Sequence, residues 1–104
     1  MKVDGYVFDS KAEARRYAEL KLLLRAGKIT GLVIHPVYVL QETFQRENGK
    51  TIRPITYEAD FCYLEGKSLV VEDVKGVETE VFRIKRKLFF FRHPDLELRI
   101  TKAR

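Results

Sequence analysis

The stretch Leu69-Val70-Val71-Glu72-Asp73-Val74-Lys75-Gly76 runs from apolar residues into an acid, a spacer and a lysine. Its β-branched residues predict a strand. Because side chains alternate along a strand, we expect Asp73 and Lys75 on one face and Glu72 on the other. A carboxylate beside an ammonium at the end of a buried strand is costly to desolvate unless a ligand uses both charges. A metal ion together with a phosphate is such a ligand, although a solvated strand end has the same Asp-x-Lys spacing.

A second carboxylate, Asp60, is expected to lie near this pair. The segment around it, Thr56 to Leu64, is rich in aromatic and β-branched residues and also predicts a strand. The turn Glu65-Gly66-Lys67 is short enough to join the two strands as an antiparallel hairpin. Counting outward from that turn puts Asp60 at the open end of the hairpin, together with Asp73 and Lys75. The alternative is that Asp60 is a solvated polar position on a two-faced strand.

A third carboxylate, Glu13, belongs to Ser10-Lys11-Ala12-Glu13, which has the Ser-x-x-Glu pattern of a helix capping box. At 100° per residue, Glu13 heads a stripe of aromatic and apolar side chains about 60° wide. The other members of this stripe are Tyr17, Leu20 and Leu24. The stripe is expected to face the sheet, so Glu13 would point inward. A capping role and a role in a metal site are compatible, and both stay open.

The remaining pattern predicts one α/β domain over residues 1–104. Helices are expected at 10–26 and 77–92, and strands at 37–44, 51–64, 67–75 and 96–100, with a short apolar stretch at 32–34. Gly27 ends the first helix, Asn48-Gly49 closes a hairpin, and His93-Pro94 stop the second helix. The element order α-β-β-β-α-β predicts a mixed, mostly antiparallel sheet flanked by two helices.

Basic residues are concentrated on the second helix. The net charge of +5 and the sequence pI of about 9.4 favour a polyanionic partner. We expect the side chains that contact nucleic-acid phosphates to be Arg83, Lys85, Arg86 and Lys87. Lys85 lies close to the apolar side of this helix, so its stem either extends to solvent or reaches the metal–phosphate site.

The second helix also carries an apolar stripe that we expect to pack in the core. The stripe consists of Val81, Ile84, Leu88 and Phe91. Phe90 points to the opposite side, between Arg83 and Arg86. It is expected either to stack on nucleic acid, to pack against a second subunit, or to be an ordinary exposed aromatic residue.

Composition excludes several other classes of protein. The single cysteine, Cys62, excludes an intrachain disulfide and a zinc cluster, and the sequence has no Gly-rich phosphate loop or Ser-His-Asp arrangement. No apolar run approaches the roughly 18 residues of a membrane span, and the first residues lack a signal-peptide core, so we expect a cytoplasmic protein. His35 keeps two interpretations: a structural or solvated residue, or a polar group near the site.

Taken in order, these motifs resemble the PD-(D/E)xK nuclease superfamily, and within it the small phage-encoded endonucleases that resolve Holliday junctions. The resemblance covers nearly the whole chain, including the basic helix. Its segments are Gly5-Tyr6-Val7-Phe8-Asp9-Ser10-Lys11-Ala12-Glu13, His35-Pro36-Val37-Tyr38-Val39-Leu40, Tyr57-Glu58-Ala59-Asp60-Phe61 and Val71-Glu72-Asp73-Val74-Lys75-Gly76. One departure is Ala59, which stands where the superfamily's name has a proline.

The resemblance implies a restriction-endonuclease-like core and an Mg²⁺- or Mn²⁺-dependent endodeoxyribonuclease with Glu13, Asp60, Asp73 and Lys75 as catalytic residues. Asp60 and Asp73 would bind the metal together with the backbone carbonyl of Val74. Glu13 would bind a second metal or order a water. Lys75 would orient the attacking water, help to deprotonate it and stabilise the transition state.

The resemblance also implies the substrate and the assembly. The substrate would be branched or junction DNA, and the products would carry 5′-phosphate and 3′-hydroxyl ends. Phage resolvases act as dimers, so a homodimer in a bacterial or phage-infected cell is expected.

Three alternatives stay open at this point. One is a non-catalytic DNA-binding protein with the same fold, and the second is a nuclease subunit of a recombination or packaging complex. The complete set of acids with Lys75 favours an enzyme, because a degenerate binding protein is expected to have lost at least one of them. The third, an RNA-binding module, lacks the paired aromatic residues expected on the sheet of common RNA readers.

Overall fold

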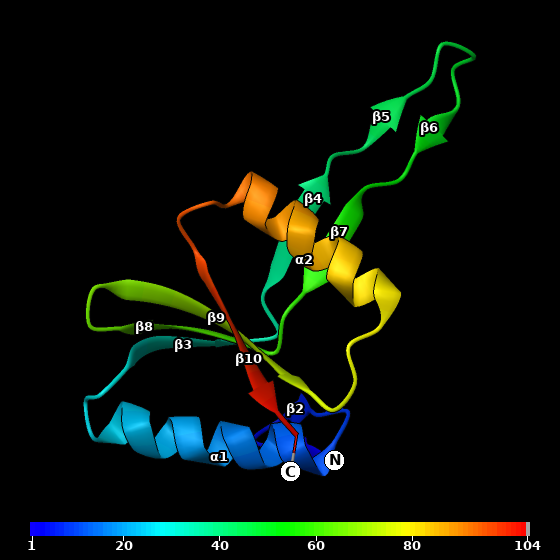
Figure 1. The fold of residues 1–104 in the computed structure, drawn as a ribbon. Helices are drawn as coiled ribbons and strands as arrows, with labels where there is room; N and C mark the ends of the chain where they lie inside the picture. The colour runs from blue at the N-terminus through cyan, green and yellow to red at the C-terminus, as the bar shows by residue number, and fades with distance from the viewer. Residues whose placement is uncertain (104) are drawn as a thin grey trace. The chain divides into compact units, whose positions relative to one another are not determined.

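The computed structural model of the protein describes residues 1–103 and contains two helices and ten strands (Figure 1). The chain divides into two compact units, which are described separately. The first unit comprises residues 1–36, 59–77 and the segment from residue 96 onward, and the second comprises Val37–Glu58 and Glu78–Asp95. In the described part of the chain, neither helix is long and apolar enough to cross a lipid bilayer.

The first unit is built on a four-stranded sheet in the order β10-β9-β8-β3. Its elements are β1 (Lys2–Val3), β2 (Tyr6–Val7), α1 (Lys11–Arg25), β3 (Thr30–Ile34), β8 (Phe61–Glu65), β9 (Ser68–Lys75) and β10 (Glu97–Lys102). The β3–β8 and β8–β9 pairs are antiparallel, and only β9–β10 is parallel. The protein is therefore an α/β protein with a mixed, mostly antiparallel sheet, as predicted.

Helix α1 packs along one face of this sheet (Figure 1). The Ser10 hydroxyl accepts a hydrogen bond from the Glu13 amide at 3.1 Å, which confirms the predicted start of the helix. The core of the unit contains Phe8, Ala14, Tyr17, Leu20, Ile29, Phe61, Tyr63 and Val70. The prediction was wrong for Leu24, which is exposed, because Leu23 packs against the core in its place.

The predicted strand at 51–64 is three separate strands, β6 (Thr51–Ile52), β7 (Ile55–Glu58) and β8. Pro54 interrupts it first because proline has no amide hydrogen to donate to a sheet. The second break, at Ala59 and Asp60, occurs because these amides bind the Pro36 and Glu72 carbonyls at 3.0 and 3.1 Å. The chain thereby leaves the second unit and enters the first.

The first strand of the four-stranded sheet also differs from the prediction. It is β3, which the sequence indicated only as a short apolar stretch. The predicted strand at 37–44 is instead β4 (Val37–Gln41) followed by β5 (Phe44–Gln45), and β4 pairs with β7 in the second unit. In chain order, α1, β3, β8, β9, α2 (Glu80–Arg92) and β10 still give the predicted α-β-β-β-α-β series.

In the second unit, the antiparallel pair β4–β7 continues into the hairpin β5–β6, which turns at Asn48-Gly49 as predicted. Helix α2 starts later than the predicted residue 77, because the Thr79 hydroxyl accepts a hydrogen bond from the Phe82 amide at 3.1 Å and caps the helix there. Its His93 end agrees with the predicted stop.

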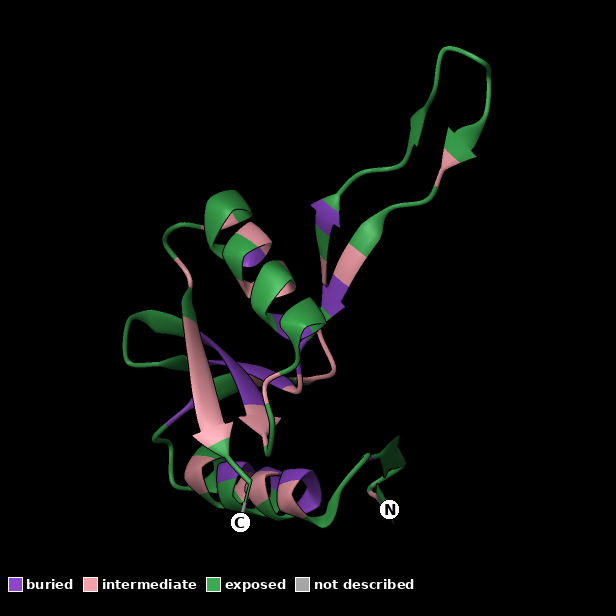
Figure 2. Cartoon of the chain, turned by 45° about the vertical axis from the view of Figure 1, so that its right-hand side comes forward, coloured by how far each residue is buried: buried purple, intermediate pink, exposed green. Residues whose placement is uncertain are grey.

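The packing face of α2 was predicted wrongly. Its buried side chains are Phe82 and Phe89, and the Phe89 ring lies 5.2 Å from Tyr38 and 5.7 Å from Tyr57, centre to centre. The predicted core stripe is largely exposed: Val81 is 62%, Ile84 59% and Phe91 82% exposed, and only Leu88 is half-buried. Most of α2 is accordingly coloured as exposed in Figure 2. The helix is apolar on two sides, so periodicity alone could not indicate which side packs.

Candidate functional site

Three polar side chains from separate segments of the first unit meet at one point. They are Glu13 near the start of α1, His35 after β3, and Asp60 before β8. One potential ligand atom from each lies within 4.8 Å of those from the other two. The closest pair is His35 Nε2 and Glu13 Oε1, at 2.8 Å. Glu13 is only 4% exposed, whereas His35 and Asp60 are half-buried.

Local backbone structure holds these side chains in place. The His35 amide donates to the Asp60 carbonyl at 2.9 Å, and the imidazole packs edge-on against the Phe8 ring. His35 adopts a φ of 54°, a left-handed conformation that is uncommon for residues other than glycine. The Asp9 amide donates to Glu13 Oε2 at 3.4 Å, so the Glu13 carboxylate both supports the start of α1 and contacts His35.

Asp60 connects the Glu13–His35–Asp60 group to strand β9, which carries Asp73 and Lys75. The Val74 amide donates to Asp60 Oδ2 at 2.7 Å, just beyond the point where the β8–β9 ladder ends with Phe61 opposite Glu72. The Asp60 carboxylate thus accepts the hydrogen bond that a backbone carbonyl would accept if the β8–β9 ladder continued by one more pair. Because the amide and carbonyl of a strand residue point toward the same neighbouring strand, the Val74 carbonyl is also directed toward the Asp60 side. This direction suits the role expected of that carbonyl.

Asp73 and Lys75 lie on the same face of β9, as predicted. Lys75 Nζ is 3.8 Å from Asp73 Oδ2, and Asp73 is only 1% exposed. Asp73 is not a member of the Glu13–His35–Asp60 group. Because Phe61 lies opposite Glu72, Asp60 and Asp73 are the next residues at the same end of the β8–β9 ladder. The expectation that Glu13 and Asp60 lie close together is met, and Asp73 and Lys75 form an ion pair on β9.

The electrostatics of the group favour a cation. Burial raises the pKa of the Glu13 carboxyl above its usual value, the hydrogen bond from His35 opposes this rise, and the charge of Asp60 adds to it. Two carboxylates in one partly buried site repel each other, and a bound cation would relieve both the repulsion and the desolvation. Two carboxylate oxygens and one imidazole nitrogen form a donor set that fits a divalent metal.

His35 is the member of this group whose role the sequence left open. In the sequence, His35 follows an apolar stretch, precedes a proline and opens one of the segments that carry the family resemblance. The contact with Glu13 depends on the pairing of β3 with β8, which brings His35 beside Asp60. The sequence pattern did not indicate that pairing, because the Asn48-Gly49 turn predicts that the strand at 51–64 pairs with the strand at 37–44.

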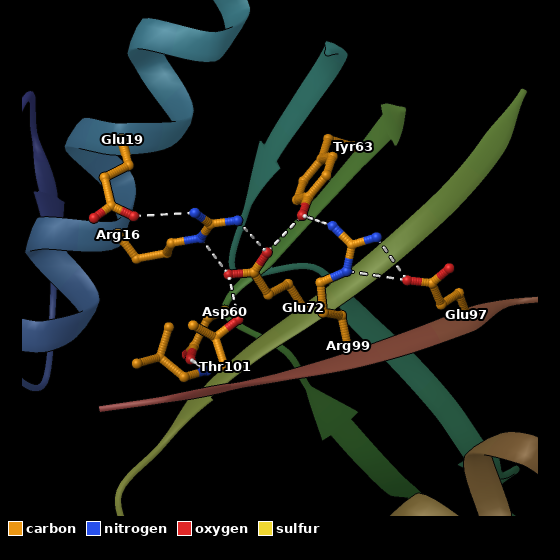
Figure 3. Close-up of polar contacts among 9 residues, drawn as sticks. Arg16, Glu19, Asp60, Tyr63, Glu72, Glu97, Arg99 and Thr101 are labelled. Carbon is orange, nitrogen blue, oxygen red and sulfur yellow. Dashed lines mark hydrogen bonds and ion pairs between the residues drawn. The ribbon is translucent and has the colours of Figure 1, made fainter. Parts of the chain in front are cut away.

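Glu72, on the opposite face of β9, forms a second polar cluster that the sequence did not indicate (Figure 3). Arg16 reaches both carboxylate oxygens, with Nε at 2.6 Å and Nη2 at 3.0 Å. The Tyr63 and Thr101 hydroxyls donate to Glu72 at 2.5 and 3.0 Å. Glu72 is fully buried, and burial together with Glu72 raises the pKa of Tyr63 to about 12. This cluster joins α1 to three strands and is structural.

A cavity of about 90 Å³ opens beside the Glu72 cluster. Its lining consists of Ala12, Arg15, Arg16, Glu19, Val74, Thr101 and Lys102. It includes none of the four predicted catalytic residues, so it is not the pocket in which they were expected to converge. Arg16 in its wall is bound to Glu72 and Glu19.

The four basic residues of α2 that were predicted to contact nucleic acid differ in their ion pairs and in their exposure to solvent. Arg86 lies 3.1 Å from Glu78 and over the Phe82 ring, so much of its charge is neutralised locally. Arg83 approaches Glu78 only at 3.9 Å and is largely exposed, Lys87 is exposed, and Lys85 is half-buried. Phe90 is 43% exposed and its ring contacts Phe89.

Comparison with known proteins adds the family of the chain. A search of curated proteins finds no match. A family model described as "Protein of unknown function (DUF1064)" matches residues 1–104. Because this match covers the whole chain, the protein belongs to the DUF1064 family.

Proposed function

We propose that the protein is a metal-dependent DNA endonuclease of the PD-(D/E)xK type that hydrolyses phosphodiester bonds in branched or junction DNA. The observation that supports this most strongly is the close approach of Glu13, His35 and Asp60, linked through Val74 to the Asp73–Lys75 pair. This arrangement combines metal-ligating oxygens with a lysine on one α/β scaffold. The products would carry 5′-phosphate and 3′-hydroxyl ends.

Each site residue has a distinct task in this proposal. Asp60, Asp73 and the Val74 carbonyl would hold Mg²⁺ or Mn²⁺, with Glu13 holding a second ion or ordering water. When bound, such an ion polarises the phosphate and makes a nearby water more acidic. Lys75 would orient the attacking water, help it to lose its proton through the positive charge of the ammonium, and offset the charge that develops on the phosphate. The Asp73 carboxylate, 3.8 Å from Lys75, keeps that ammonium in place.

The test is cleavage by the purified protein. Labelled four-way junction, flap and plain duplex DNA would each be incubated with Mg²⁺, Mn²⁺ or EDTA. Cleavage that requires metal and favours the junction is the expected result. Metal-independent binding without cleavage of any substrate would contradict the proposal and favour a non-catalytic DNA-binding protein. Cleavage that appears only after recombination or packaging proteins are added would favour a subunit of such a complex.

DNA is also the proposed partner of α2, in the cytoplasm of a bacterial or phage-infected cell. Changing Arg83 and Lys87 together to glutamine should reduce the salt dependence of DNA binding, because each lost phosphate contact lowers the slope of log affinity against log salt by roughly 0.9. The Arg86→Gln variant is the matched comparison and should change the slope less, since Glu78 already neutralises Arg86. Fluorescence anisotropy at several salt concentrations measures the slopes. Unchanged slopes in all variants would show that α2 does not contact DNA.

The largely exposed stripe on α2, formed by Val81, Ile84, Phe91 and the half-buried Leu88, supports a homodimer. The helix begins with Glu80 and ends with Arg92, so two antiparallel copies would place acidic and basic ends together and oppose their helix dipoles. A twofold interface of this kind uses the same surface on both subunits. It would also supply two cleavage sites for a junction, which presents two scissile phosphates.

A charge in this stripe should therefore produce a monomer. Phe91→Glu is the sharper substitution, because Phe91 is far more exposed than the neighbouring Phe90. Multi-angle light scattering should give a dimer for the wild type and a monomer for this variant, with the helical content retained by circular dichroism. Gln45→Glu adds the same charge on an exposed strand and should remain dimeric. A wild-type protein that is monomeric at micromolar concentration would refute the interface.

A further inference from the structure

We propose that the His35 imidazole is a metal ligand and makes the Glu13–His35–Asp60 group bind first-row transition-metal ions in preference to Mg²⁺. This inference rests on the metal site of the proposed function, and it goes beyond that function by naming the residue that selects the ion. His35 was not among the residues expected to bind metal. Its contact with Glu13 and its closeness to Asp60 come from the structure.

The distances between the potential ligand atoms of this group already approach those found around a bound metal ion. Ligand atoms at about 2.0–2.2 Å from one ion are at most about 4.4 Å apart. The potential ligand atoms of Glu13, His35 and Asp60 lie within 4.8 Å of one another, so binding requires side-chain movements of only a few tenths of an ångström. The 2.8 Å contact between His35 and Glu13 shows that the imidazole nitrogen already points at the Glu13 carboxylate.

The backbone fixes the imidazole in this position. The His35 amide is bonded to the Asp60 carbonyl, the residue adopts its left-handed φ, and the ring packs against Phe8. With its backbone held in this way and its ring in contact with Phe8 and Glu13, the side chain loses little further conformational entropy when it binds a metal. The imidazole is therefore a preorganised ligand.

Ligand chemistry then decides which ion is preferred. Mg²⁺ prefers oxygen ligands in near-ideal octahedral geometry and retains several waters. Imidazole favours later transition metals, and affinity for a mixed nitrogen and oxygen site rises from Mn²⁺ toward Zn²⁺. A site with two carboxylates alone would not discriminate in this way. The nitrogen of His35 is what gives Mn²⁺ and Zn²⁺ their advantage over Mg²⁺.

The variant that tests this is His35→Asn. Asparagine, like histidine, tolerates a positive φ better than most residues, so the backbone is expected to keep its conformation. Isothermal titration calorimetry would measure Mn²⁺, Zn²⁺ and Mg²⁺ binding to the metal-free protein. We expect the wild type to bind Zn²⁺ most tightly and Mg²⁺ least. His35→Asn should lose about tenfold or more in Mn²⁺ and Zn²⁺ affinity and much less in Mg²⁺ affinity. Glu13→Gln is the matched control and should weaken all three ions.

A spectroscopic measurement on the wild type makes the test independent of any variant's folding. Pulsed electron paramagnetic resonance of the Mn²⁺-loaded protein should detect coupling to a directly bound nitrogen, and His35→Asn should remove it. Wild-type Mn²⁺ without nitrogen coupling, or an unchanged ratio of Mn²⁺ to Mg²⁺ affinity in His35→Asn, would overturn the inference. These readouts do not use DNA. A selective metal site without cleavage would refute only the nuclease, and cleavage with Mg²⁺ at an unselective site would refute only the role of His35.

Discussion

Lys75→Met is expected to lower the rate of DNA cleavage by about 10²- to 10³-fold while leaving DNA affinity nearly unchanged. The ammonium of Lys75 lies beside Asp73 at the end of β9, where it can stabilise charge that develops only in the transition state. Methionine keeps an apolar stem of similar length and removes only the charge. Under the proposed function, phosphate contacts elsewhere on the protein would supply most of the ground-state affinity, so binding should survive.

Asp73→Asn should abolish cleavage for a related reason. The substitution preserves the shape of a side chain that is 1% exposed, so the fold is expected to remain, but it removes the negative charge proposed to hold the metal. Single-turnover cleavage and anisotropy would separate chemistry from binding in both variants. Lys67→Met is the control for Lys75→Met, because Lys67 is an exposed lysine in the turn between β8 and β9. Undiminished cleavage by Asp73→Asn with Mg²⁺ or Mn²⁺ would refute the assigned role.

Arg16→Met should destabilise the protein by about 3 kcal/mol or more, because it leaves the buried Glu72 carboxylate without its cationic partner. Glu72 is fully buried and its two oxygens bind the Arg16 guanidinium at 2.6 and 3.0 Å. The hydroxyls of Tyr63 and Thr101 remain as donors, but they carry no charge. For a protein of this size, the midpoint of thermal unfolding should fall by about 12 °C or more.

Two further variants test whether the loss of stability comes from the buried pair of Arg16 and Glu72. Glu19→Gln breaks only the exposed ion pair of the same arginine and should cost less than about 1 kcal/mol. Combining Arg16→Met with Glu72→Gln should recover part of the loss, because the unpaired buried charge is then gone. Calorimetric unfolding of the single and double variants measures the coupling. If Arg16→Met costs no more than Glu19→Gln, the buried pair does not stabilise the fold as described.

The chain's local pattern was enough to predict several elements of the first unit. The Ser10 cap and the apolar spacing placed α1, the turn at 65–67 placed the β8–β9 hairpin, and strand alternation placed Asp73 and Lys75 on one face. These features depend on residues close in sequence, whose relative directions follow from a 100° or a 180° repeat. Helix ends and short hairpins are therefore readable from the sequence, and the inward direction of Glu13 followed from the same geometry.

Only the tertiary structure decided which distant segments meet. The choice of β3 as the partner of β8 brought His35 to Asp60 and Glu13, and the packing of α1 brought Arg16 to Glu72. The packing face of α2 was likewise unpredictable, because aromatic rings from β4 and β7 select Phe82 and Phe89 over an equally apolar stripe. Which elements pack together depends on the packing free energy between whole elements. The periodicity of the residues within one element carries no information about the element that packs against it. The sequence by itself therefore determined the acids and the lysine, and the fold determined that a histidine joins them.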